Sequence, residues 1–176
     1  MSRAKELYRQ LYRLFDDCTP LSTDCGQCCH GACCTEEGGD GMFLYPGEEE
    51  LLQSASFLTL QKSSFRVNGK PVTIALCEGR CDRALRPLAC RIFPLFPYVK
   101  PGSRPVVFMD PRAGAICPIA RVMQPSELES QFVRRVNRTA LLLHKFEQSR
   151  IFMEEQSNLL DELCGSYEIL RKILSE

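Results

Sequence analysis

The chain has almost no histidine and no net charge, and each shortage removes a class of function. Its 176 residues include only two histidines, His30 and His144, so a catalytic zinc site built on three histidines is excluded. The 22 basic residues balance the 22 acidic residues, and such a composition does not favour a surface that binds polyanions. A nucleic-acid partner is therefore not expected.

Long apolar segments are missing as well. The densest apolar run, residues 140–143, is far short of the roughly 20 residues that cross a bilayer. Residues 1–7 mix charges within a helical pattern and lack the apolar core of a secretory signal. We therefore expect a cytoplasmic protein without a membrane-spanning segment. A glycine-rich nucleotide fingerprint is also absent, since Gly38-Gly39-Asp40-Gly41 is too weak a match.

Cysteine, by contrast, is abundant and clustered. Of the 11 cysteines, most fall into two dense groups: Cys25, Cys28, Cys29, Cys33 and Cys34, and then Cys77, Cys81 and Cys90. An odd total with adjacent pairs argues against complete disulfide pairing, and the cytosol keeps thiols reduced. Closely spaced thiols in that compartment indicate metal ligands.

Local patterns predict a mixed α+β fold. Apolar residues at helical spacing predict a helix over 3–15, and Pro46-Gly47 followed by three glutamates predicts a second helix that ends near Phe57. Asn68-Gly69 between β-prone runs predicts a hairpin over 65–76 that leads directly to Cys77. Prolines in the segment 77–117 exclude a long helix there and leave a strand at 106–109.

The last third of the chain is predicted to be helical. Residues 126–129 match a capping box for a long helix, and a second helical pattern runs from Leu160 to Leu174. The two form an antiparallel pair if the chain turns near residues 156–158, or one bent helix if it does not. We expect a single domain with an N-terminal helix over 1–17, a small, irregular cysteine-rich metal-binding core over 18–120, and a C-terminal helical segment over 121–176.

The spacing of the first cysteines suits metal binding. Cys25 and Cys28 form a Cys-x-x-Cys step, which presents two sulfurs to one ion, and zinc and iron–sulfur clusters both use such thiolates. Cys33 returns after a short loop, and Cys77 with Cys81 makes a second close pair. Because adjacent side chains leave extended backbone on opposite faces, the doublets 28–29 and 33–34 divide their sulfurs between two sites, or between a site and the core.

The remaining candidates have a simpler explanation. Cys18 and Cys164 are expected to be small buried hydrophobic side chains. His30 lies among the first cysteines, but the thiols already exceed a tetrahedral requirement, so we expect it in solvent or behind the ligands.

A longer run, Arg86-Pro87-Leu88-Ala89-Cys90-Arg91-Ile92-Phe93-Pro94, adds a resemblance. Together with the first cysteines, Cys77-x-x-x-Cys81 and Cys117-Pro118, it resembles the YkgJ-like cysteine-cluster family, described as zinc- or iron-chelating proteins. The resemblance covers about residues 25–117. It implies that eight cysteines form the metal site: Cys25, Cys28, Cys29, Cys77, Cys81, Cys90 and Cys117, with Cys33 or Cys34 as the eighth. Some relatives are linked to S-adenosylmethionine-dependent lysine methylation of flagellin, so the resemblance also permits methyl transfer.

Basic and apolar residues accompany the thiols. Four thiolates around zinc, or around a four-iron cluster, leave a net charge of about −2 that calls for compensating donors. The nearest arginines in sequence are Arg80, Arg83, Arg86 and Arg91. Residues 93–97 read Phe-Pro-Leu-Phe-Pro. We expect these apolar residues to exclude water from the metal or to pack as ordinary core.

Three functions remain open at this point. In the first, the metal is structural and the helices over 127–176 dock a protein partner. In the second, an iron–sulfur cluster transfers electrons or serves an oxidoreductase. In the third, the site supports methyl transfer or a catalytic cysteine, although neither histidine offers an obvious partner base.

Ligand type does not separate zinc from iron, although the bacterial ferredoxin spacing is absent. We predict a metal-binding protein that holds zinc or an iron–sulfur cluster. The predicted ligands are Cys25, Cys28, Cys29, Cys33, Cys77, Cys81, Cys90 and Cys117.

Overall fold

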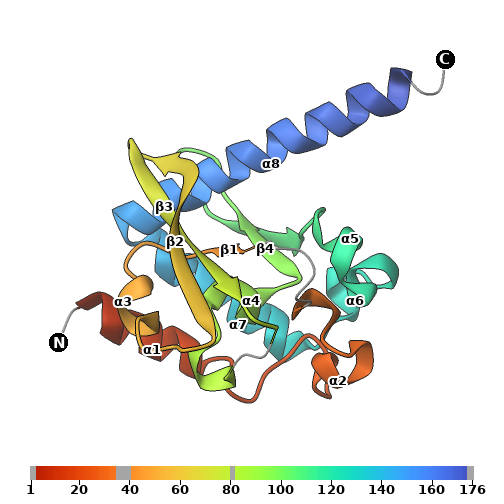
Figure 1. Ribbon diagram of the computed structural model, residues 1–176. Helices are drawn as coiled ribbons and strands as arrows, with labels where there is room; N and C mark the ends of the chain where they lie inside the picture. Colours follow the sequence, from red (N-terminus) through yellow and green to blue (C-terminus); the bar gives the residue numbers. More distant parts are fainter. Residues whose placement is uncertain (1–2, 35–40, 80–81, 174–176) are drawn as a thin grey trace.

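Figure 1 shows the protein as a computed structural model, which describes residues 3–34, 41–79 and 82–173. Helices surround two small antiparallel sheets, so the predicted α+β class is confirmed. No helix in these ranges is both long and apolar enough to cross a membrane.

The N-terminal helix forms where its apolar spacing predicts. Helix α1 spans Arg3–Arg13 and buries Tyr8, Leu11 and Tyr12, which lie three or four residues apart on one face. Two short elements that carry cysteines follow, α2 (Cys25–Cys29) and the 3₁₀ helix η1 (Ala32–Cys34). Helix α3 covers only Glu49–Leu52, so the prediction that it continues to Phe57 is wrong. The chain turns after Leu52, and a long strand starts at Leu58.

The predicted hairpin is present. Strands β2 (Leu58–Val67) and β3 (Lys70–Cys77) are antiparallel, and β1 (Met42–Phe43) pairs with the other edge of β3. Asn68 and Gly69 both adopt positive φ, 50° and 74°, as a tight two-residue turn requires. Strand β3 ends at Cys77, which confirms that the hairpin leads to the second cysteine group.

The proline-rich segment contains only short elements in its described part. These are the 3₁₀ helix η3 (Arg83–Leu85), α4 (Leu88–Ile92), strands β4 (Leu95–Tyr98) and β5 (Val106–Met109), α5 (Ala113–Ile116) and α6 (Pro118–Val122). Strands β4 and β5 pair to form the second sheet. The expected strand at 106–109 and the exclusion of a long helix are both confirmed.

The C-terminal helices differ from the predicted boundaries. The capping box belongs to η4 (Pro125–Glu127), where the side chains of Gln124 and Glu127 cap each other's backbone. Helix α7 begins later, at Ser130, and ends at His144. Helix α8 spans Glu147–Ile173 without a turn at residues 156–158, so the break between the two helices lies about ten residues earlier than expected. Figure 1 shows α8 extending well beyond the sheets.

One hydrophobic core joins these elements. Tyr8 and Phe15 from the N-terminal region pack with Phe132 and Leu143 of α7 and with Leu88 of α4, all almost fully buried. The rings of Phe15 and Phe132 meet edge to face, with centroids 6.2 Å apart. This packing fixes α1, α4 and α7 around the region where the cysteines gather.

Candidate metal centre

One cleft gathers cysteines that are distant in sequence. It has a volume of about 50 Å³, and its lining includes six cysteines, Cys18, Cys25, Cys29, Cys33, Cys90 and Cys117. Arginines from η3 and α4 complete the wall, together with Phe93 and Pro94. Three cysteines of the first predicted group, Cys90 of the second group and the later Cys117 therefore line the same cleft.

The first group is held by a short capped helix. The Asp24 side chain accepts a hydrogen bond from Gly26 N at 3.1 Å and caps α2. At the other end, His30 (φ 53°) and Gly31 (φ 69°) adopt left-handed conformations that end the helix within two turns of Cys25. This tight reversal returns the chain so that both Cys29 and Cys33 line the cleft.

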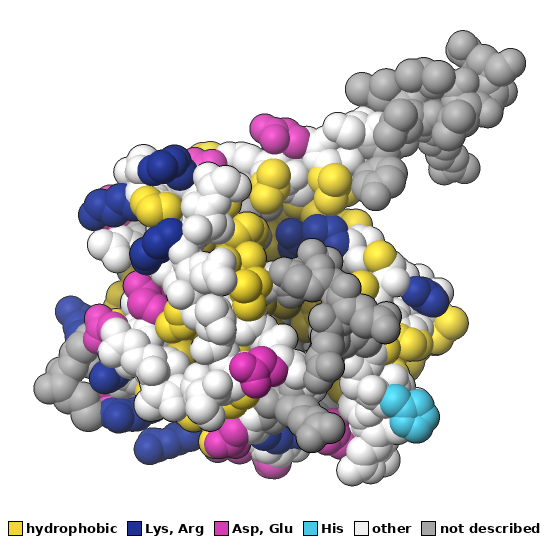
Figure 2. All heavy atoms as spheres, viewed as in Figure 1, with side chains coloured by type: hydrophobic (Ala, Val, Ile, Leu, Met, Phe, Trp, Pro, Cys, Tyr) yellow, Lys and Arg dark blue, Asp and Glu magenta, His cyan; other side chains and the backbone are white. Residues whose placement is uncertain are grey.

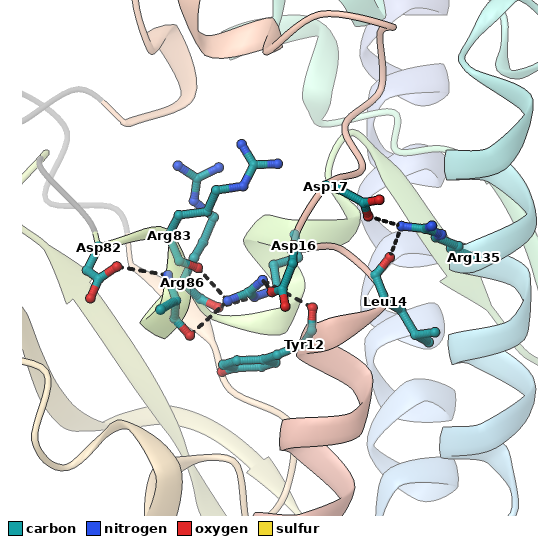
Figure 3. A network of polar contacts seen from close by, with 10 residues as sticks. Tyr12, Leu14, Asp16, Asp17, Asp82, Arg83, Arg86 and Arg135 are labelled. Carbon is teal, nitrogen blue, oxygen red and sulfur yellow. Dashed lines mark hydrogen bonds and ion pairs between the residues drawn. The ribbon is translucent and has the colours of Figure 1, made fainter.

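An ion pair connects the two cysteine groups. Arg83 Nη1 lies 3.5 Å from Asp24 Oδ2, so the residue that caps α2 also binds the loop before Cys90. The pair is partly exposed and contributes little to stability, but it places η3 beside α2. Figure 3 shows the side chains of Arg83 and Arg86 extending to the same side of that loop, and both residues line the cleft.

Arg91 is buried and organises the loop through its carbonyl groups. Its guanidinium donates to the backbone oxygens of Arg83 (2.5 Å), Ala84 (3.0 Å), Arg86 (2.7 Å) and Tyr12 (3.3 Å). It also stacks over the Tyr12 ring, 4.1 Å from the centroid. The sequence suggested that Arg91 compensates thiolate charge. The structure shows that most of its donors hold the backbone that carries Arg83 and Arg86.

A buried carboxylate anchors the start of α4 from the other side. Glu48 is fully buried and accepts hydrogen bonds from the Tyr12 hydroxyl (2.6 Å) and from the backbone N–H groups of Leu88 (2.6 Å) and Tyr45 (3.0 Å). Burial raises the pKa of Glu48 to about 7. Because Leu88 is the first residue of α4, this carboxylate helps to set the position of Cys90.

Helix α7 fixes the chain on the Cys18 side of the cleft. Arg135 donates to the backbone oxygen of Leu14 (2.6 Å) and to Asp17 Oδ1 (2.5 Å), as Figure 3 shows. At the start of α7, Glu129 N donates to Pro20 O at 2.9 Å. The segment that contains Cys18 is thereby held between α1 and α7.

The thiols experience different environments. Burial raises the pKa of Cys25 to about 11, and the neighbouring Asp24 acts in the same direction. A hydrogen bond with Cys34 lowers the pKa of Cys33, whose sulfur lies 3.9 Å from that of Cys34. Thiolates are the metal-binding form, and a bound cation lowers the pKa of a thiol that ligates it.

The other predicted ligands lie elsewhere or are not described. Cys28 and Cys77 are exposed and do not line the cleft. Cys81 and Arg80 fall outside the described residues. Cys34 is half-buried, and His30 is exposed, as expected.

The two cysteines that were expected to be buried core residues have different surroundings. Cys18 is buried, at 5% exposure, yet it lines the cleft as well. Cys164 is half-buried on α8, one residue after Leu163, which is 39% exposed. Docking of a partner on the C-terminal helices stays a prediction.

The sulfurs are gathered, but they are not as close as ligands of one ion. Across residues 3–34, 41–79 and 82–173, no three His, Cys, Asp or Glu side chains lie close enough to hold a metal ion.

Comparisons with known proteins do not identify a function. No family model, no curated protein and no solved structure matches this chain. The resemblance to the YkgJ-like family therefore stays a prediction.

The chemistry of the lining nevertheless fits a thiophilic metal. Every potential ligand side chain in the described lining is a cysteine, with no Asp, Glu or His among them. Such a set suits zinc and iron–sulfur clusters and does not suit magnesium or calcium, which take oxygen ligands. The lining arginines supply the positive charge that a thiolate-rich centre requires.

Two residues that position the cleft were not singled out by the sequence. Glu48 lies in a run of three glutamates, where a role at the positive end of a helix dipole was the expected one. Its burial depends on Tyr12, 36 positions earlier, and no local pattern reports such a contact. Arg135 likewise lies on an amphipathic helix, where a solvated arginine is the default.

Proposed function

We propose that this protein binds a metal through cysteine thiolates, as a zinc ion or an iron–sulfur cluster, in a structural or redox role. The observation that supports the proposal is the convergence of Cys25, Cys29, Cys33, Cys90 and Cys117 on one cleft. These residues come from α2, η1, α4 and the junction of α5 with α6. The fold brings thiols that are far apart in sequence to the lining of one cleft, which is what a shared ligand would need.

The residues of the cleft have different roles in the proposed metal binding. The five cleft thiolates hold the metal, and Cys28, Cys77 and Cys81 are further ligands that the family resemblance implies. Arg83 and Arg86 offset the negative charge of the thiolates, since burying that charge alone is costly. Phe93 and Pro94 keep water away from the sulfurs, and this protects the centre from oxidation.

Metal binding requires the sulfurs to approach one another further. Zinc binds four ligands in a tetrahedron, each sulfur about 2.3 Å from the ion, and no three side chains of the described residues are close enough together for such a site. Cys33 is exposed and lies in η1, a 3₁₀ helix of three residues, so only a short element has to move to bring its sulfur inward. Binding would then also tie α2 to α4 and stabilise the fold.

Matched cysteine variants test the proposal. Cys29→Ser and Cys90→Ser remove cleft thiols, whereas Cys164→Ser removes a thiol from α8 that lies outside the cleft. Each protein is purified without oxygen, and bound zinc, iron and sulfide are measured per chain. We expect the first two variants to lose most of the metal and Cys164→Ser to keep the wild-type amount. Equal metal in all three variants would contradict the proposal.

Neighbouring cysteines refine the ligand set. Cys28→Ser alters an exposed thiol adjacent to Cys29, so the two variants differ by one position in the chain. Metal loss in both supports the larger set that the resemblance implies. Loss in Cys29→Ser alone restricts the centre to the thiols of the cleft.

A further inference from the structure

The two long C-terminal helices carry charge of opposite sign. Residues 130–145, which include α7, contain four basic residues and no acidic residue. Residues 151–170 of α8 contain five acidic residues and no basic residue. Because the whole chain has 22 residues of each sign, this separation of charge is a local feature of the two helices.

The exposed face of α7 combines basic side chains with an apolar centre. Leu141 is 46% exposed and lies in the middle of this face. A shallow groove around it is lined by Val133, Arg134, Asn137, Arg138, Leu141, Leu142 and Lys145. The lining contains three cations and no acidic side chain. An exposed leucine among cations suits a partner surface that is both apolar and acidic.

The later part of α8 has a face of that kind. Leu159 and Leu163 are 37% and 39% exposed and lie one helical turn apart. Glu155 precedes Leu159 by four residues and Glu162 follows it by three, so both carboxylates flank this leucine on one face. Figure 2 shows hydrophobic and acidic side chains together at the surface along α8, and Figure 1 shows the helix continuing beyond the sheets.

The charges that flank the two leucines have no counter-ion within the chain. Arg138, Lys145, Glu155 and Glu162 form no ion pair with another residue of the described ranges. The ion pairs that α8 does form involve other residues, Arg150 with Glu154 and Lys100 with Asp161. The two faces are therefore open to a contact between molecules.

The spacing of the two faces matches when the helices run in opposite directions. On α7, three and then four residues separate the central leucine from its flanking cations, Arg138 and Lys145. On α8, three and then four residues separate Leu159 from its carboxylates, counted from Glu162 back to Glu155. At about 1.5 Å per residue, the two charges on each helix are about 10.5 Å apart along the axis. Antiparallel packing then places Arg138 opposite Glu162, Lys145 opposite Glu155 and the two leucines opposite each other.

We propose that this protein associates with a second copy of itself, with α7 of one copy packed antiparallel against α8 of the other. Because each copy carries both faces, a two-fold axis repeats the contact and closes the assembly as a dimer. The leucines lose contact with water, and the paired charges set the register and the direction of the helices. The contact does not involve the proposed metal centre, and it identifies a second copy as the partner of the C-terminal helices.

The mass of the assembly in solution tests the proposal. Sedimentation velocity is measured on the full chain at low and high protein concentration, with a phosphine reductant that prevents disulfides between exposed cysteines. We expect the mass to rise from one copy towards two as the concentration increases. Added salt should weaken this association, because exposed charges are screened. A chain that stays monomeric at every concentration overturns the proposal.

Charge reversal tests the antiparallel register. Arg138→Glu and Glu162→Arg should each raise the Kd of the dimer about tenfold, because an attraction becomes a repulsion. The variant that carries both changes should recover the wild-type Kd. Arg138→Glu combined with Glu155→Arg should bind more weakly still, since these two positions are not opposite each other.

A matched control separates this contact from the effect of net charge. Arg104→Glu makes the same charge change at an exposed residue outside both helices and should keep the wild-type Kd. The proposal is overturned if Arg138→Glu and Arg104→Glu have equal effects. It is also overturned if adding Glu162→Arg restores the dimer no better than adding Glu155→Arg.

Discussion

The buried carboxylate of Glu48 makes the stability of this protein depend on pH in a defined direction. Burial raises its pKa from 4.5 to about 7, although hydrogen bonds from Tyr12, Leu88 and Tyr45 and the nearby Arg91 act to lower it. Folding therefore favours the protonated carboxyl. Its contribution is fully present below about pH 4.5 and is lost as the pH rises through about 7.

The two pKa values set the size of the effect. Between about pH 5 and pH 8, the free energy of unfolding should fall by roughly 2–3 kcal/mol through Glu48 alone. Other groups also titrate in this range, so the wild type must be compared with a variant that differs only here. Glu48→Gln has nearly the same shape and no titrating proton. Its amide nitrogen meets a donor such as Tyr45 N, and the resulting penalty does not depend on pH.

Urea unfolding of both proteins at several pH values between 5 and 8 measures this contribution. The advantage of the wild type over Glu48→Gln should shrink by roughly 2–3 kcal/mol from the lowest to the highest pH. A difference that stays constant, or grows as the pH rises, would refute the assignment of a raised pKa to Glu48. The outcome bears on the cleft, because Glu48 holds the N–H of Leu88 at the start of the helix that carries Cys90.

Three further perturbations test the contacts of Arg91, the contact of Ser157 and the contribution of the metal to stability. Arg91→Met should destabilise the protein by about 3 kcal/mol, because the carbonyls that Arg91 binds lose their donor. Arg91→Lys should fall between that variant and the wild type in urea unfolding, since lysine lacks the planar fork, and a wild-type stability for Arg91→Met would exclude the role. Ser157→Ala leaves the buried N–H of Val99 without its 2.9 Å acceptor and should cost about 1–2 kcal/mol; an unchanged unfolding midpoint would show that this bond between α8 and the residue after β4 is dispensable. Removal of metal by a chelator should lower Tm by roughly 10 °C if the centre ties α2 to α4, and an identical Tm with and without metal would speak against that tie.

The elements predicted correctly are those whose signal is local. Asn68-Gly69 fixes a tight turn through two residues that tolerate positive φ, and the hairpin follows. Helix α1 likewise follows from apolar residues that recur every three or four positions. In both cases the backbone preference and the burial of side chains favour the same structure.

The boundaries predicted wrongly depend on contacts with the rest of the fold. Ser126–Glu129 resembles a capping box, but Gln124 and Glu127 form the actual box, and Leu128 is buried before α7 starts. Similarly, α8 passes through residues 156–158 because Ser157 is buried against Val99 and its hydroxyl bonds within the helix to Met153 O. A polar run suggested a turn, and tertiary packing kept the helix.

The candidate site was accessible to sequence reasoning only in part. The two cysteine groups suggested shared ligands, and five of the predicted thiols do line one cleft. The sequence could not tell which cysteine of each adjacent pair lines the cleft. The structure shows that Cys29 and Cys33 line it, whereas Cys28 is exposed outside it.

The most direct test of the account is the metal content of the unmodified protein. The chain is purified without oxygen, its visible spectrum is recorded, and zinc, iron and sulfide are counted per chain. We predict either a colourless protein with stoichiometric zinc or a brown protein with iron and sulfide. A protein free of both metals, or one whose cleft cysteines are joined in disulfides, would contradict metal binding by the cleft thiolates.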